Sequence, residues 1–540
     1  MDVDELDELR SYIAHELENY FFTVNENNFE ELEQNGNEVI VDLVDYEFEE
    51  QQRMPKISKK PDLSTFTQSE LYTEIKRDCG LPANNKIPSD IWSLENLIRY
   101  RENGVIGHPY GTLSSGHKRR IGNLYIPNEK AERLMSLESK IFISKFNRDG
   151  SKLITGSQDS VIRIFDASKG TYHRINRIQA QDVNWCILDM DFSPCGKEFV
   201  YSTWSDYFIS CPIDGSERDF TWANIRSQEN RACVFSVRYS PCGKYFLGGC
   251  NNSSINLFDR ESSVPKRIYI DDDGRNDVNA VSYLDDSPFV FVSGCHFGQI
   301  RIWDSRCLGG ENRGSSRQSR HGHNRPTHKP VGYLLGHSDG ITYLDSKCDG
   351  RYLLSNSKDQ SIKIWDIRSP LPKEKEELTR KRVHLKWDYR WDSVPNEFYN
   401  SGDKNDGDTS VMTYRGHRVT KSLIRAKFSP LETTGQRFIY TGCGTGRVIV
   451  YDVLTGKIRE AIGGHRDVVR DVDWHPIRHE IVSSSWDSHV NLNKFKRTAE
   501  KVASSNGGRR RHDDDYVRRS RRLALRTNTT VDSADDMRNM

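Results

Sequence analysis

Two stretches of this chain end in the same four-residue pattern, and that pattern restricts the folds open to it. Trp303-Asp304-Ser305-Arg306 and Trp365-Asp366-Ile367-Arg368 each follow a run of alternating apolar residues, as expected where a β-strand ends. Trp-Asp strand endings that recur along a chain are typical of a propeller of WD repeats. Because side chains alternate along a strand, the Asp and the Arg project from the same side, which predicts a guanidinium at the rim of the propeller.

Strand endings of this kind recur seven times. Four of the six steps between them are 42 to 47 residues long, close to the roughly 40–45 residues of a WD blade. The two longer steps, of 62 and 86 residues, predict insertions at 308–330 and 369–412. The endings are Ile164-Phe165-Asp166, Cys211-Pro212-Ile213, Leu257-Phe258-Asp259, Ile302-Trp303-Asp304, Ile364-Trp365-Asp366, Val450-Tyr451-Asp452 and Leu492-Asn493-Lys494. We therefore predict an all-β fold, a seven-bladed WD-repeat β-propeller over residues 111–497.

Two features of the repeats predict how the propeller is held together. The fifth repeat places four residues where WD repeats carry a linked polar set that is structural rather than catalytic: His337, Ser355, Asp359 and Trp365. The seventh repeat stops after its third strand, so its outer strand must come from upstream of the first repeat. Residues 120–126 alternate in a suitable way and are the expected strand, since closure removes an open sheet edge.

Both ends of the chain differ from the middle. Residues 1–52 hold 17 acidic side chains and one basic side chain, Arg10, whereas residues 494–540 have an excess of six bases. We expect an acidic, largely disordered arm at 1–62 with an amphipathic helix at 4–21, and a disordered basic tail at 498–540. Between arm and propeller, residues 63–110 are predicted to be a helical extension, with Thr67-Gln68-Ser69-Glu70 as a capping box.

Several classes of function find no support in the sequence. There is no nucleophile–base pair, phosphate loop or metal-ligand spacing, so we expect no catalysis, no cofactor and no metal. No apolar run is long enough for a membrane span or a secretory signal. The eleven scattered cysteines are typical of reduced thiols inside a cell. Arg509-Arg510-Arg511 and the bases at 518–522 are interpreted as a nuclear import signal, so we expect a nuclear and cytoplasmic protein. The alternatives for these bases are a solvated tail or a weak nucleic-acid contact. We expect no direct nucleic-acid partner.

The extended motif around the second Trp-Asp pair carries a resemblance to a known family. Residues 355–368 resemble the motif of WD-repeat substrate receptors of cullin-4 RING ubiquitin ligases. Residues 65–495 as a whole resemble the DDB- and cullin-4-associated factor 11 family, also called the WD-repeat-containing protein 23 family. Stretches that carry the likeness are Gly336-His337-Ser338-Asp339-Gly340, Trp387-Asp388-Tyr389-Arg390-Trp391, Met412-Thr413-Tyr414-Arg415-Gly416-His417 and Ile481-Val482-Ser483-Ser484-Ser485-Trp486-Asp487.

The resemblance implies a non-catalytic receptor. Such a receptor docks on the triple-propeller damage-binding adaptor, reaches cullin-4 and a RING subunit through it, and presents protein substrates for ubiquitination and proteasomal degradation. Stress-response leucine-zipper transcription factors are the substrates implied. On this basis Arg306 and Arg368, with Asp304 and Asp366, are the expected adaptor-binding residues, and the helices at 4–21 and 67–79 are candidates for a second contact.

Alternatives remain beside that interpretation. Phe297 stands where the motif has an Asp, so the fifth repeat is the fuller copy. Each Asp–Arg pair is also explained as a surface ion pair without functional weight. Trp387-Asp388-Tyr389-Arg390 has the same four-letter pattern without a preceding strand, and is interpreted as an aromatic anchor that packs the long insertion on the ring. The rival function is a general WD-repeat scaffold in nuclear RNA or chromatin assemblies, with no ubiquitin role.

Overall fold

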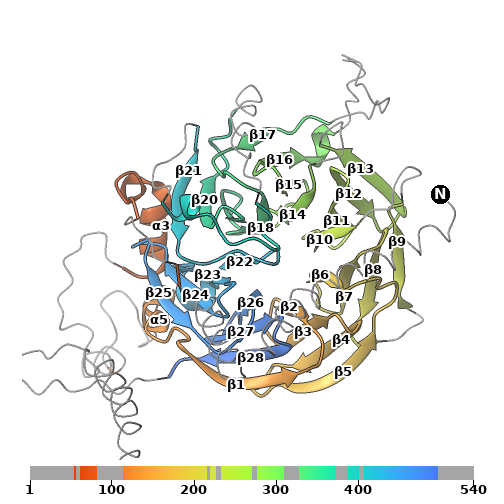
Figure 1. Ribbon diagram of the computed structural model, residues 1–540, viewed down its shortest axis with the longest axis horizontal. Helices are drawn as coiled ribbons and strands as arrows, with labels where there is room; N and C mark the ends of the chain where they lie inside the picture. The colour runs from red at the N-terminus through yellow and green to blue at the C-terminus, as the bar shows by residue number, and fades with distance from the viewer. Residues whose placement is uncertain are drawn as a thin grey trace, which may run out of the picture. The chain divides into compact units, whose positions relative to one another are not determined.

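The alternating segments form antiparallel strands, and the strands form seven four-stranded sheets arranged as a ring (Figure 1). The computed structural model describes residues 54–55, 61–81, 102, 114–215, 219–226, 233–270, 276–308, 328–371, 387–400 and 407–496. The first strand of each sheet contacts the first strands of both neighbouring sheets, and the last contact in this series, between β26 and β2, closes the ring. The predicted seven-bladed WD-repeat propeller is therefore confirmed.

The blades follow the order of the sequence. Blades 1 to 3 comprise β2 (Ile141–Phe146), β3 (Lys152–Ser157), β4 (Val161–Asp166) and β5 (His173–Gln179); β6 (Ile187–Phe192), β7 (Glu198–Thr203), β8 (Tyr207–Pro212) and β9 (Thr221–Asn224); and β10 (Val234–Tyr239), β11 (Tyr245–Cys250), β12 (Ser254–Asp259) and β13 (Val264–Tyr269). Blades 4 and 5 comprise β14 (Val278–Tyr283), β15 (Val290–Cys295), β16 (Ile300–Asp304) and β17 (Gly332–Leu334); and β18 (Ile341–Ser346), β19 (Tyr352–Ser357), β20 (Ser361–Asp366) and β21 (Ser410–Arg415). Blades 6 and 7 comprise β22 (Ala426–Phe428), β23 (Phe438–Gly442), β24 (Val448–Asp452) and β25 (Ile458–Ile462); and β26 (Val469–Trp474), β27 (Glu480–Ser485), β28 (His489–Lys494) and β1 (Glu129–Ser136).

Blade 7 is completed from the other end of the chain, but not by the predicted segment. Its outer strand is β1, which pairs antiparallel with β28 from Glu129 opposite Lys494 to Ser136 opposite His489. The expectation of a strand at 120–126 is wrong, because most of that segment belongs to helix α5 (Ser115–Gly122) and the turn after it. Ser114 supplies the cap: its side chain accepts a hydrogen bond from the backbone N–H of His117, a helix start that strand alternation does not reveal.

The antiparallel order within each blade defines two faces of the ring. Turns after the first and third strands lie on one face, which we call the lower face. Turns after the second strand, and the connections from one blade to the next, lie on the opposite face, which we call the upper face. The two long sequence steps correspond to the connections from β16 to β17 and from β20 to β21, so both depart from the lower face.

Helix α3 (Glu70–Asp78) packs on the outer edge of the propeller rather than standing apart from it. Its buried residues Leu71 and Ile75 join one apolar cluster with side chains of blades 5 and 6, among them Tyr414 and Tyr451. Figure 1 places α3 beside β21 accordingly. The predicted helix exists, but its cap is Ser69, which accepts from the N–H of Tyr72, and not Thr67, which lies in a short 3-10 turn (Phe66–Gln68).

Three short helices accompany this arrangement. α5 contacts α8 (Leu431–Thr434), which lies in the lower-face turn between β22 and β23, and α7 (Asn396–Asn400) belongs to the long insertion. The expected helix at 4–21 and the basic tail at 498–540 lie outside the described residues. No helix in the described part of the chain is both long and apolar enough to cross a membrane.

The pairing of β1 with β28 predicts a specific sensitivity. Leu134 is half-buried against the apolar cluster shared by blades 7 and 1, whereas its neighbour Arg133 is exposed. We expect Leu134→Asp to lower the free energy of unfolding by about 2 kcal/mol, because a carboxyl group enters apolar surroundings, and Arg133→Asp to change it by less than about 0.5 kcal/mol. Urea unfolding followed by tryptophan fluorescence measures both. A larger loss in Leu124→Asp than in Leu134→Asp would contradict closure by β1.

Candidate partner-binding rim

The two Trp-Asp-x-Arg motifs lie on the lower face, in the turns that follow β16 and β20 of adjacent blades. Each Trp is fully buried and anchors its strand: the indole N–H of Trp303 donates to the Ser293 hydroxyl at 2.9 Å, and that of Trp365 donates to the Ser355 hydroxyl at 2.7 Å. Each Arg is largely exposed, with 62% of the Arg306 side chain and 54% of the Arg368 side chain accessible to solvent. Burial of the Trp therefore fixes where the following Arg emerges.

Asp304 orients Arg306. The carboxylate accepts the backbone N–H of Arg306 at 2.9 Å, and it accepts the side chain through Nε at 2.9 Å and Nη2 at 2.6 Å. These hydrogen bonds hold the pKa of Asp304 below its usual value. The guanidinium also lies over the ring of Phe289, with 5.2 Å between Cζ and the ring centroid. Arg306 is therefore a charged fork in a defined position, which a partner can bind without ordering a free side chain.

Arg368 repeats the fork but has a second acidic neighbour. Nε and Nη2 donate to the Asp366 carboxylate at 3.1 and 2.9 Å, and Nη2 also lies 3.2 Å from Oε2 of Glu70, the first residue of α3. Hydrogen bonding with Asp366 raises the pKa of Arg368 above its ordinary value. The two motif arginines are consequently not equivalent, because only Arg368 contacts the N-terminal helix.

Arg351 completes the link between α3 and blade 5. It lies in the lower-face turn between β18 and β19, and it forms ion pairs with Glu70, with Glu74 at 3.0 Å and with Asp366 at 3.4 Å. The hydrogen bond from Arg351 is the main reason that the pKa of Glu70 lies below its usual value. Two carboxylates one helical turn apart on α3 thus face two arginines on one blade. The sequence alone did not reveal this contact, because nothing in it connects position 70 with position 351 or 368.

The structure brings together the four residues of the expected polar set in blade 5. His337 Nδ1 lies 2.8 Å from Asp359 and Nε2 lies 2.7 Å from the Ser355 hydroxyl, which also accepts from Trp365. Burial alone would raise the pKa of Asp359, but His337 holds it well below its usual value. All four side chains are almost fully inaccessible, so this set supports the blade and presents nothing to a partner.

Blade 7 contains a similar set that sequence reasoning missed. His465 lies 3.0 Å from Asp487 and 2.9 Å from the Ser483 hydroxyl, and Asn493 donates to that hydroxyl at 3.1 Å in the place that Trp365 occupies in blade 5. The Gly-His pair at 464–465 was the available signal. That pair does not point to Asn493, because an Asn does not match the Trp-Asp pattern.

The third Trp-Asp-x-Arg stretch has the same local fork on the opposite face. Asp388 accepts the backbone N–H and Nε of Arg390, each at 3.0 Å. Trp387 donates to Asp339 at 3.2 Å, and the Lys358 ammonium lies 4.1 Å from the ring centroid of Tyr389; both partners belong to upper-face connections. The stretch thus packs on the ring through its aromatic residues. It provides a copy of the fork that is separated from the lower face.

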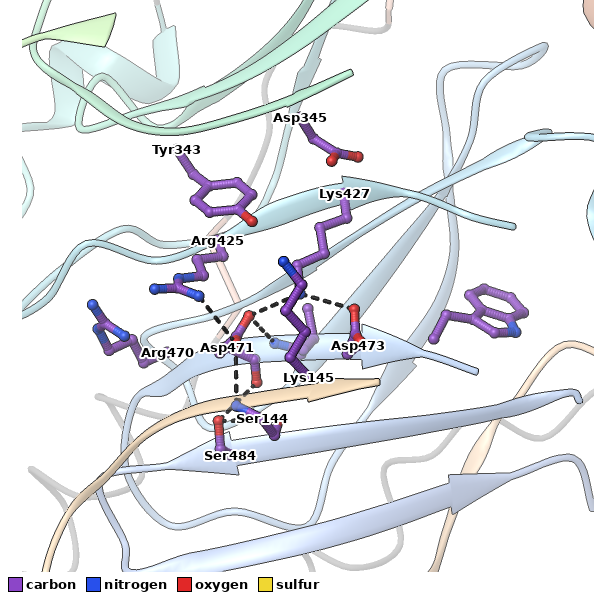
Figure 2. A network of polar contacts seen from close by, with 12 residues as sticks. Ser144, Lys145, Tyr343, Asp345, Arg425, Lys427, Arg470, Asp471, Asp473 and Ser484 are labelled. Atoms are coloured by element: carbon purple, nitrogen blue, oxygen red, sulfur yellow. Dashed lines mark hydrogen bonds and ion pairs between the residues drawn. The ribbon is translucent and has the colours of Figure 1, made fainter. Parts of the chain in front are cut away.

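The axis of the propeller is filled by charged side chains of the inner strands. Arg425 of blade 6 reaches across to blade 2, where Nη2 lies 3.0 Å from the Leu188 carbonyl and 2.9 Å from the Asp189 carboxylate. Figure 2 shows Arg425 and Lys427 directed at Asp471 and Asp473 in the same cluster. Although burial opposes it, the charges of Arg238 and Arg425 hold the pKa of Asp189 well below its usual value. The centre is therefore a buried ionic network.

The described residues contain no group of three or more His, Cys, Asp or Glu side chains arranged to hold a metal ion. The chemistry that the rim can perform is recognition: two oriented guanidinium groups on adjacent blades offer planar donors to carboxylates or to backbone carbonyls.

Comparison with known proteins agrees with this architecture. The model of the WD domain, G-beta repeat, matches residues 134–166, 224–259, 328–366 and 456–492. The DDB1- and CUL4-associated factor 11 homolog of Caenorhabditis elegans is 37% identical over 395 residues, which cover 71% of this chain and 66% of that protein. The homolog of Caenorhabditis briggsae is 33% identical over 455 residues, which cover 80% of this chain and 76% of that protein. The LEC14B protein of Lithospermum erythrorhizon is 32% identical over 427 residues, which cover 77% of this chain and 85% of that protein.

Seven four-stranded blades and the matched repeats define a WD-repeat propeller protein. Within that class, the chain belongs to the family of DDB1- and CUL4-associated factor 11 homologs, together with the LEC14B proteins. The resemblance on which the sequence interpretation rests is thereby confirmed.

Because the polar set of blade 5 is buried, a substitution in it should change the stability of the protein and leave the exposed surface unaltered. We expect Ser355→Ala to lower the free energy of unfolding by about 2–4 kcal/mol, because His337 and Trp365 would each lose a buried hydrogen-bond partner at about 1–3 kcal/mol per group. Ser262→Ala, in an exposed turn of blade 3, should change it by less than about 0.5 kcal/mol. Chemical denaturation of both variants is the measurement. Equal stabilities would show that the set contributes little.

Proposed function

We propose that this protein is a non-catalytic substrate receptor of a cullin-4 RING ubiquitin ligase. Its relatives carry names that state association with DDB1 and CUL4, and this chain is more than 30% identical to them over most of its length. The observation that carries the proposal is the exposed, carboxylate-oriented Arg306 on the lower face, beside Arg368 on the next blade. Both arginines dock the triple-propeller damage-binding adaptor, which connects the receptor to cullin-4 and the RING subunit.

The N-terminal helix α3 forms part of the same docking surface. Glu70 and Glu74 hold the start of the helix beside Arg351 and Arg368, and Leu71 and Ile75 bind it to blades 5 and 6. The fork of Arg368 thus serves partly within the chain, as an anchor for α3, and Arg306 is the arginine more available to the adaptor. The adaptor contacts α3 and Arg306 together.

The upper face presents the substrate. The lower face is assigned to the adaptor, and the ionic network formed by Arg425, Asp189 and Asp471 occupies the axis, so a substrate segment binds over the upper face and not through the centre. The substrates are target proteins, with leucine-zipper transcription factors as the candidates, and they are marked for ubiquitination and degradation. We place the receptor in the nucleus and the cytoplasm.

The three forks allow a matched test. Arg306→Ala should weaken adaptor binding about thirtyfold, the equivalent of losing one interface hot spot, because the adaptor loses its charged anchor. Arg390→Ala removes a guanidinium with the same local geometry from the opposite face, and it should leave adaptor affinity unchanged. Biolayer interferometry with purified adaptor gives both dissociation constants.

Three other outcomes would change the assignment. Full affinity in the double variant Arg306→Ala/Arg368→Ala would move the adaptor contact entirely to the N-terminal helices. Equal losses in Arg306→Ala and Arg390→Ala would indicate a general loss of positive charge rather than a defined contact. No binding of adaptor by the unaltered chain would favour the rival role, a general WD-repeat scaffold.

The proposed role of α3 predicts a loss of adaptor affinity that is smaller than that of Arg306→Ala. Glu70→Gln removes the charge that pairs with Arg351 and Arg368, so α3 should be held less firmly and adaptor affinity should fall about three- to tenfold. Glu432→Gln is the control, since Glu432 is another exposed lower-face acid that pairs only loosely with Arg119 at 3.8 Å. The same binding measurement applies, and the melting temperature of both variants should match that of the unaltered chain. An unchanged affinity for Glu70→Gln would separate the helix from the docking surface.

A further inference from the structure

The course of the N-terminal segment shows where the acidic arm begins. Pro61 lies at the lower side of blade 6, next to Gly456 in the turn after β24. The two residues are so close that a Cβ atom at position 456 would lie 2.7 Å from Cβ of Pro61. Met54 lies at the upper side, where the Thr445 hydroxyl, in the turn between β23 and β24, lies 3.6 Å from its sulfur. The two residues therefore lie at opposite sides of blade 6, and residues 1–53 precede a residue at its upper rim.

Positive side chains gather on the upper face around that starting point. The connections of blades 6 and 7 carry Arg418, Lys421, Arg447 and Arg466, a set that we call the basic sector. Their acidic neighbours are already engaged: Asp467 forms an ion pair with Lys421 at 3.0 Å, and Asp487 belongs to the buried set of His465. Arg466 is exposed, and 42% of the Lys421 side chain is accessible. The basic sector thus offers charge to an acidic ligand.

An arc of aromatic rings adjoins the basic sector on the same face. It runs from blade 7 to blade 3 through successive ring contacts with centroid distances of 5.8, 5.6, 6.0 and 6.1 Å, and its members in order are Trp486, Phe142, Trp185, Trp204 and Phe235. Trp185 and Trp204 are each nearly half exposed, at 47% and 46%. These two tryptophans, whose rings are in contact, are the exposed part of the arc, whereas Phe142 is buried. Adjoining accessible aromatic side chains are typical of a binding surface.

The acidic arm has the composition that this face would bind. Residues 1–52 carry a net charge of −16, and apolar residues are interspersed among the acids: Leu6, Leu9, Ile13, Leu17, Tyr20, Phe21, Phe22 and Phe29. Such a segment can offer carboxylates to the basic sector and apolar side chains to the aromatic arc. We propose that residues 1–53, the part of the acidic arm that precedes Met54, dock on the upper face across the basic sector and the aromatic arc.

The attachment point makes even a weak contact effective. For a tether of 53 residues the random-coil relation gives a root-mean-square span of roughly 40 Å, and a span of that size corresponds to an effective local concentration on the order of millimolar. Because the contact depends on charge, it weakens as salt rises and the Debye length falls from about 30 Å at 0.01 M to about 3 Å at 1 M. The docked arm covers the face that, if the proposed function holds, receives substrates, so an acidic segment of a partner has to displace it.

Carbodiimide cross-linking of the full chain tests the contact, because the reagent joins a carboxylate to an amine with no spacer. The variant Arg466→Lys keeps the charge and places an amine in the basic sector, while the native Lys244, 55% exposed in a lower-face turn, is the control amine. We expect residues 2–50 to link to position 466 at least about fivefold more often than to Lys244 at about 0.01 M salt, and the preference to vanish at about 1 M. Mass spectrometry of peptides from mixed isotope-labelled and unlabelled chains gives the frequencies.

Two results would overturn the proposal. One is equal linking to position 466 and to Lys244 at low salt; the other is linking only between labelled and unlabelled copies, which would assign the arm to a second molecule. A charge-reversal variant gives an independent measure: Lys421→Glu/Arg466→Glu should speed limited proteolysis of residues 1–53 at least about threefold, and Lys244→Glu should leave the rate unchanged. Neither measurement involves the adaptor, so a failure here leaves the receptor function standing, and loss of adaptor binding leaves this inference standing.

Discussion

The whole ring depends on one non-local pairing, that of β1 with β28. Without it blade 7 would have three strands and an open outer edge at β28. The same pairing brings β1 to the outer edge of blade 7. Before β1 in the sequence, Met54 and Pro61 contact blade 6, and α3 packs against blade 5.

Sequence predicted the parts of the fold that repeat. The third strands were found because Trp303 and Trp365 end theirs in a recognisable way, and the polar set of His337 followed from the same regularity. Alternation at 120–126 wrongly predicts the closing strand, because residues 120–122 end the helix that Ser114 caps and 123–125 form the turn after it, with Leu124 67% exposed. The axial network could not be predicted, since it joins residues such as Asp189 and Arg425 that no periodicity relates.

At the rim, sequence found the two arginines but not the difference between them. Arg306 is oriented by its own Asp304 and by Phe289, all within one blade. Arg368 also forms an ion pair with Glu70, which lies 298 positions earlier in the sequence. Only the packing of α3 against the blade reveals this contact. The two copies of the motif therefore differ in their contacts. Among the described residues, Arg306 is bound only within its own blade and is exposed to a partner, whereas Arg368 also binds Glu70 of helix α3.

The ionic network at the axis also constrains how the chain is made. Arg425 donates to a carbonyl of blade 2 that lies 237 positions earlier, so the inner edge of blade 2 lacks this partner until blade 6 has been synthesised. Because β1 pairs with β28, the last strand of the propeller, blade 7 cannot be completed until the whole propeller has been synthesised. A product that ends before blade 6 lacks Arg425, the partner of Leu188 and Asp189, and one that ends before β28 leaves β1 without its partner strand.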